Sequence, residues 1–122
     1  MPVYTTTEPP VLTVDIKRSR IRIHKKTYHL LDSPAYCRFL INPEKKAIVV
    51  ELCDASTPGA VKLPKLASDH SSVEVHSKSL ISELVVCAGY ENYTSVRLFG
   101  HFFPEQNAVF FRMDAGNQAV QA

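Results

Sequence analysis

An internal duplication is the feature that most constrains the fold of this chain. Three short segments of the first half recur in the same order in the second half, and self-similarity of this kind determines architecture. The separations between copies are 52 (75 − 23), 59 (97 − 38) and 61 (104 − 43) residues. The second copy therefore gains seven residues, about two helical turns, and then two more. The paired segments are 23–27 with 75–79, 38–40 with 97–99, and 43–50 with 104–111.

Hydrophobic periodicity predicts the elements of each copy. Residues 20–24 alternate strictly between polar and apolar side chains, which is the pattern of a half-buried strand. A short helix is predicted over 26–31, ending before Pro34. A longer helix is predicted over 78–88, with Ser77 as its N-cap and Gly89 as its C-cap. The predicted strands are 11–16, 20–24, 36–41, 47–52, 73–76, 94–99 and 108–113.

Each copy then contains a strand, a helix and two further strands, and the first copy has an additional strand at its start. Two such units can share one antiparallel sheet about a pseudo-twofold axis and cover one face with both helices. The predicted class is therefore α+β, a two-layer arrangement of two pseudo-symmetric strand–helix–strand–strand repeats. The predicted organisation is a flexible arm (1–10), a single domain (11–114) made of repeat one (11–54), a linker (55–72) and repeat two (73–114), and a flexible tail (115–122).

Composition places the chain among soluble globular proteins. Its 122 residues suit one domain, and 45% hydrophobic with 21% charged residues is an ordinary balance. The apolar runs are far shorter than a membrane helix requires, and the N-terminus lacks the features of a signal peptide. Three cysteines without paired spacing argue against a disulfide framework. We therefore expect a cytoplasmic protein with no membrane partner.

The formal charge of +2 conceals an asymmetry between the two halves. Residues 1–66 hold eleven Lys or Arg against six Asp or Glu, and residues 67–122 hold three against six, which gives +5 and −3. Six fixed cations fall within residues 17–26. Alternate side chains of a strand stand about 6.6 Å apart on one face, so these cations are spaced to meet successive phosphates. The predicted nucleic-acid-binding residues are Arg18, Arg20, Arg22, His24, Lys25 and Lys26.

Two alternatives stay open for this basic strand. It could be a solvated sheet face or an edge strand made basic against aggregation, or it could dock on an acidic protein surface. His24 and His76 hold matching places in the two copies, as do Arg38 and Arg97. A pseudo-symmetric anion site would use such pairs, whereas plain duplication of strand ends and turns would also preserve them.

Catalytic and cofactor chemistry has no recognisable pattern in the sequence. Metal-binding spacings of Cys and His are absent, as are a nucleophile elbow and a glycine-rich phosphate loop. No pair of carboxylates is spaced for general acid–base work. We therefore expect no catalytic residue, no metal site, no cofactor and no enzymatic activity.

Two aromatic clusters complete the candidate sites. Tyr90 and Tyr93 flank one predicted loop of the second copy, and Phe102 and Phe103 lie in another predicted loop, in the two-residue extension that the first copy lacks. These four are the predicted partner-binding residues, since exposed aromatic side chains often mark interfaces; the alternative is a local cap on the sheet. The predicted function is a small, non-enzymatic binding or regulatory protein that contacts DNA or RNA through the basic strand. The alternative is a protein–protein interaction or assembly module, including a homodimer.

Overall fold

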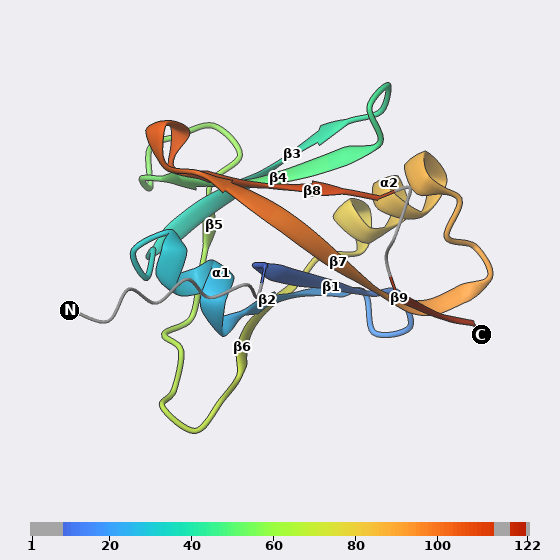
Figure 1. Ribbon diagram of the computed structural model, residues 1–122, viewed down its shortest axis with the longest axis horizontal. Helices are drawn as coiled ribbons and strands as arrows, with labels where there is room; N and C mark the ends of the chain where they lie inside the picture. The colour runs from blue at the N-terminus through green and yellow to red at the C-terminus, as the bar shows by residue number, and fades with distance from the viewer. Residues whose placement is uncertain (1–8, 114–117, 122) are drawn as a thin grey trace.

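One curled antiparallel sheet dominates the computed structural model, which describes residues 9–113 and 118–121. The strand order is β5-β3-β4-β8-β7-β1-β2-β6, and β9 pairs with β7. Two helices accompany this sheet in the described ranges, so the predicted α+β class is confirmed (Figure 1). The strands are β1 (Val11–Asp15), β2 (Arg20–His24), β3 (Tyr36–Asn42), β4 (Ala47–Cys53), β5 (Val61–Lys62), β6 (Ser72–His76), β7 (Tyr93–Phe103), β8 (Ala108–Arg112) and β9 (Gln118–Gln121).

Strand β7 joins the two halves of the sheet. Its residues 95–99 pair with β1, and its residues 100–103 pair with β8. At the change of partner, a side chain on Gly100 would place its Cβ 2.6 Å from the Phe111 ring and 2.9 Å from the Phe110 carbonyl oxygen. Only glycine allows β7 to pass so close to β8, and β7 runs diagonally between the two halves in Figure 1.

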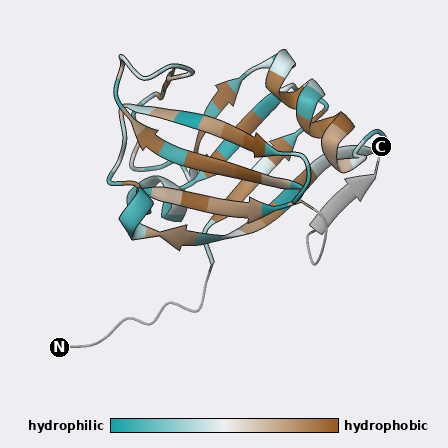
Figure 2. Cartoon of the chain, turned by 90° about the horizontal axis from the view of Figure 1, so that it is seen from above, coloured by the Kyte–Doolittle hydropathy of each residue, from teal (hydrophilic) through white to brown (hydrophobic). Residues whose placement is uncertain are grey.

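The core lies between these two halves. Because alternate residues of a strand point to opposite faces, each half turns one apolar face inward, and hydrophobic residues recur along the strands in Figure 2. Both halves contribute side chains with no exposed surface. Among them are Leu12, Val14, Ile21, Ile23, Ile48, Val50, Leu98, Val109 and Phe111.

Helices α1 (Lys25–Leu30) and α2 (Lys78–Ala88) lie towards opposite ends of the molecule's long axis (Figures 1 and 2). The two helices thus accompany a curled sheet, whereas a two-layer arrangement with both helices on one face was expected. The predicted caps of α2 are confirmed. The Leu80 amide donates to the Ser77 hydroxyl at 3.2 Å, and Gly89 takes the left-handed conformation with φ 74°. Helix α1 has no side-chain N-cap, since its N-cap residue is His24.

The predicted and observed organisation differ in four places. The loop prediction for Phe102 and Phe103 is wrong, because β7 continues through both residues and Phe102 packs against the core. Strand β5 forms inside the predicted linker, and β9 forms inside the predicted tail by pairing with the edge of β7. Pro10, assigned to the flexible arm, is buried and its carbonyl accepts a hydrogen bond from Gly100 at 2.8 Å. The remaining arm and tail predictions, for 1–8, 115–117 and 122, lie outside the described residues, as does residue 114 of the predicted second repeat.

Candidate anion-binding surface

The predicted basic strand, β2, lies inside a polar surface built from four neighbouring strands. Thr13 of β1 pairs with Arg97 of β7 on one side and with Arg22 of β2 on the other, and Arg22 pairs with Glu74 of β6. The intervening residues of these strands point into the core, so the polar residues share the opposite face. We call this surface the outer face. Its residues are Ser95 and Arg97 of β7, Thr13 and Asp15 of β1, Arg20, Arg22 and His24 of β2, and Ser72, Glu74 and His76 of β6.

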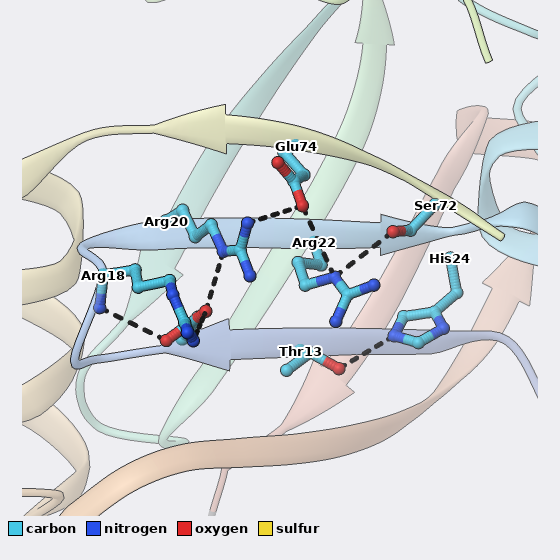
Figure 3. Close-up of polar contacts among 8 residues, drawn as sticks. Thr13, Arg18, Arg20, Arg22, His24, Ser72 and Glu74 are labelled. Carbon is cyan, nitrogen blue, oxygen red and sulfur yellow. Dashed lines mark hydrogen bonds and ion pairs between the residues drawn. The ribbon is translucent and has the colours of Figure 1, made fainter. Parts of the chain in front are cut away.

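Arg20 is held between two carboxylates. Its Nε lies 2.7 Å from Asp15 Oδ2 and its Nη1 lies 2.6 Å from Glu74 Oε2 (Figure 3). Burial opposes ionisation of Asp15, but the hydrogen bond from Arg20 and the charges of Arg20 and Arg18 outweigh it, so the Asp15 pKa is lowered. The same hydrogen bond raises the pKa of Arg20. The Arg20 side chain is only 17% exposed. Its guanidinium is therefore bound by carboxylates of the protein itself.

Arg22 and Arg18 are less constrained. Arg22 Nε lies 3.3 Å from Ser72 Oγ and 3.8 Å from Glu74 Oε2. Arg18 Nη1 lies 3.7 Å from an Asp15 oxygen, and its side chain is 64% exposed. The open row of cations expected from the sequence is therefore a network of ion pairs. The cause is the neighbouring strands, since β1 and β6 each bring one carboxylate to the arginines of β2.

His24 is not one of the cations of this surface at neutral pH. Its Nε2 lies 2.8 Å from Thr13 Oγ1 (Figure 3). Burial, followed by the positive charges of Arg97 and Arg22, lowers the pKa of His24 from 6.5 to about 4. The imidazole is therefore neutral near pH 7, so His24 adds no positive charge to the arginines of β2.

Exposed positive charge gathers instead where β2 runs into α1. A hollow of about 580 Å³ lies there, which we call the α1 hollow. Lys25, Lys26 and Arg97 line it together with His24, His29 and Ser71, and no Asp or Glu is among its described lining residues. Salt-bridge partners within 4.0 Å are absent for Lys25 and Arg97 in the part of the chain that the structure describes.

Arg97 was not among the predicted binding residues. It was matched with Arg38 in the duplicated segments, but the two arginines occupy different surroundings. Arg38 lies on β3, where its Nε is 2.6 Å from Glu51 Oε1. Arg97 lies on β7, opposite Thr13 on β1, and is exposed. Only the pairing of β7 with β1 brings Arg97 beside the residues of β2.

The two matching histidines do not form a common site. In the pairing of β2 with β6, His24 lies opposite Ser72 and His76 lies opposite Arg20. Four residues of strand, about 13 Å, separate the two positions. The pseudo-symmetric site that would unite both imidazoles is therefore not formed.

The predicted aromatic partner-binding residues are divided between two places. Tyr90 is buried and its hydroxyl donates to the Met113 carbonyl at 2.7 Å, while Tyr93 packs edge-on against it. Phe102 is half-buried against the core. Phe103 alone of the four is exposed, at 42%, at the far end of β7. Tyr90 therefore stabilises the fold, and Phe103 is the most exposed of the four residues.

Among the described residues, no group of three or more His, Cys, Asp or Glu side chains is placed to hold a metal ion. Burial, with a smaller effect of Cys53, raises the pKa of the Cys37 thiol to about 12, so this thiol stays protonated and unreactive. Neither helix of the described chain has the length and apolar character to cross a bilayer.

The chain matches no protein-family model, no curated protein and no solved structure. Function is therefore inferred from the geometry and charge of the outer face and the α1 hollow.

Proposed function

We propose that this protein is a small, non-enzymatic, cytoplasmic binding or regulatory protein that contacts nucleic acid through the outer face. The observation that supports this proposal is the placement of cations at both ends of β2. Lys17 and Arg18 lie in the turn before β2, and Lys25, Lys26 and Arg97 line the α1 hollow after it. A five-residue strand is about 17 Å long, so the two groups can reach phosphates several nucleotides apart.

The arginines in the middle of the face have a different role in this proposal. Arg20 is bound by Asp15 and Glu74, and so it orders the three strands and contributes little to the ligand. The two cation groups would contact phosphates and not base edges. Such contacts do not distinguish one base sequence from another. We therefore expect binding that is strongly weakened by salt and only weakly dependent on sequence.

Fluorescence anisotropy with labelled duplex and single-stranded oligonucleotides, titrated with salt, tests this proposal. We expect wild-type protein to bind in low salt and the double variant Lys25→Gln/Arg97→Gln to bind about tenfold or more weakly. The slope of log affinity against log salt should also fall by about one for each phosphate contact removed. The control is Lys45→Gln/Lys46→Gln, which removes two exposed cations from the turn between β3 and β4.

Equal losses in both double variants would show only that net charge matters, and would overturn the assignment to the outer face. Absence of wild-type binding to every oligonucleotide in low salt would overturn nucleic-acid binding altogether.

A second candidate function is assembly with an acidic partner or a second copy of the chain. It would use the carboxylates at one end of the molecule and the cations at the other. The cationic α1 hollow lies towards one end of the long axis, whereas the exposed Glu83 and Glu91 belong to α2 and to the loop after it, towards the other end, which also carries the exposed cations Lys17, Arg18 and Lys78. Head-to-tail contact would join these ends. Size-exclusion chromatography in low and high salt tests it, and a monomer under both conditions would rule it out.

The further proposal of two pseudo-symmetric repeats is supported by strand register. The order strand, helix, strand, strand occurs in β2-α1-β3-β4 and again in β6-α2-β7-β8. A twofold axis through an antiparallel pair of equivalent strands places equivalent residues opposite each other at its centre. Arg22 pairs with Glu74 at a separation of 52 (74 − 22), and Val49 pairs with Phe110 at 61 (110 − 49). Both separations are those of the duplicated segments.

The register does not favour the proposed match of Arg38 with Arg97. In the first hairpin Ile41 pairs with Ile48, and in the second Phe102 pairs with Val109, each 61 residues later (102 − 41 and 109 − 48). A constant separation of 61 across both strands makes Phe99 the counterpart of Arg38. The separation of 59 is therefore best explained as a chance similarity.

A further inference from the structure

We propose that the α1 hollow binds a terminal phosphate monoester, the group at the end of a nucleic-acid strand. This inference rests on the proposed function and adds the chemical class of the group that is bound. Positive charge converges on the α1 hollow. A phosphodiester carries one negative charge, whereas a monoester carries about 1.5 to 2 at neutral pH and offers three acceptor oxygens. Lys25, Lys26 and Arg97 line one hollow, and so they suit a single, more highly charged group.

The neighbouring hollows of the outer face, in contrast, are lined in part by carboxylates. The hollow beside Arg18 and Arg20 includes Asp15, and the hollow on the β6 side of Arg22 includes Asp69 and Glu74. A phosphate entering either of them would meet negative charge. Of these three hollows, the α1 hollow alone has no carboxylate among its described lining residues.

Hydrogen-bond donors and apolar surface also line the α1 hollow. The planar guanidinium of Arg97 can donate two parallel hydrogen bonds to a phosphate, and the Ser71 hydroxyl can donate a further one. Pro9 and Leu30 add apolar lining on which a sugar can rest. A volume of about 580 Å³ falls within the usual range of small-ligand sites, roughly 300–1,000 Å³.

His24 gives the site a spectroscopic reporter. It lines the hollow, and its imidazole is fixed by the 2.8 Å contact with Thr13 Oγ1. The positive charges of Arg97 and Arg22 help to keep it neutral. An anion between these groups would offset that repulsion, so binding should raise the pH at which His24 takes up a proton.

Two measurements on the 122-residue chain test the proposal. The first compares the affinities of one single-stranded oligonucleotide with a 5′-phosphate, a 3′-phosphate or hydroxyls at both ends. We expect at least one phosphorylated form to bind about tenfold tighter than the hydroxyl form, since hydrogen bonds to a charged group are stronger than those to a neutral group. Arg97→Gln should abolish this difference. Lys17→Gln, at the opposite end of the outer face, should preserve it.

The second measurement follows the His24 imidazole resonances by NMR during titration with inorganic phosphate, without any nucleic acid. We expect saturable shifts and a higher titration midpoint in wild type, and neither in Arg97→Gln. Thermal unfolding of each variant verifies that the fold is intact.

The outcomes separate this proposal from the broader one. Equal affinity for phosphorylated and hydroxyl oligonucleotides would overturn the monoester site while leaving nucleic-acid binding in place. Saturable binding of inorganic phosphate at His24, with no affinity for any oligonucleotide, would support an anion site and overturn the nucleic-acid function. No response of His24 to phosphate, together with equal oligonucleotide affinities, would overturn the site completely.

Discussion

Glu74 determines how much of the positive charge on β2 is available to a ligand. Its carboxylate lies 2.6 Å from Arg20 and 3.8 Å from Arg22, and its side chain is 39% exposed. Partly exposed ion pairs contribute only about 0.2–1 kcal/mol, so such a pair can be exchanged for a contact with phosphate at small cost. Glu74 therefore weakens the attraction of the outer face for anions and helps to align β2 with β6.

We expect Glu74→Gln to bind oligonucleotides about two- to fivefold more tightly, because both arginines lose an acidic neighbour. The free energy of unfolding should fall by about 0.5–1 kcal/mol, since Arg20 loses one of its two partners. Anisotropy and urea denaturation measure the two effects. Glu44→Gln is the control, because it removes the same charge from an exposed turn between β3 and β4. Equal tightening in both variants would contradict the assigned role of Glu74.

The depressed pKa of His24 predicts that acid destabilises the protein. The neutral imidazole is favoured in the folded state, because burial and then the positive charges of Arg97 and Arg22 oppose its protonation, so the unfolded chain binds a proton more readily. The stabilisation is complete above pH 6.5 and is lost as the pH falls towards 4. Asp15 does not act in this window, because its pKa is lowered from 3.8.

We therefore expect wild type to have a lower urea midpoint at pH 5 than at pH 7. The decrease should be smaller in His24→Gln. His76→Gln, which alters an exposed histidine at the edge of the sheet, should behave like wild type. An unchanged pH dependence in His24→Gln would contradict the burial and charge argument.

Single-residue environments were only partly predictable from the sequence. Alternation correctly placed Arg20, Arg22 and His24 on one face, because that pattern is local. The charges opposite them were not predictable, since they depend on which strands become neighbours. Glu74 is 54 residues from Arg20, and Arg97 is 75 residues (97 − 22) from Arg22. These residues are brought together only when the sheet folds.

At the scale of elements, β7 shows the limit of local patterns. Its first residues alternate, but Gly100 and the aromatic run after it are typical of a loop. The strand continues because its second half pairs with β8 and buries part of Phe102. The caps of α2 were predictable because a cap depends on residues next to the helix.

We expect Gly100→Ala to destabilise the protein by about 1–3 kcal/mol, the usual cost of overpacking. The new Cβ would lie 2.6 Å from the Phe111 ring and 2.9 Å from the Phe110 carbonyl oxygen. Urea denaturation measures the change. In a double-mutant cycle, Phe111→Leu should cost less in the Gly100→Ala background than in wild type, because the smaller side chain relieves part of the clash. Strictly additive free energies would show that the ring and the new methyl group do not meet.

At the scale of the whole molecule, each proposed repeat depends on the other for its partners. Strand β2 pairs with β6, and β4 pairs with β8, so both sheet contacts cross between the repeats. Strand β1 of the first repeat also pairs with β7 of the second. Each repeat therefore needs strands of the other to complete its sheet. For this reason the duplication could predict a shared sheet but could not predict how that sheet curls.

We therefore expect the fragments 1–66 and 67–122 to be unfolded alone and to assemble into a 1:1 complex when mixed. A homodimer of the first fragment would place Arg22 opposite Arg22, whereas the mixed pair places it opposite Glu74. The fragments also carry net charges of +5 (11 − 6) and −3 (3 − 6), which favour the mixed pair. Circular dichroism and analytical ultracentrifugation measure folding and stoichiometry. A 67–122 fragment carrying Glu74→Arg should complement poorly, and cooperative unfolding of either fragment as a monomer would show that a single repeat is sufficient.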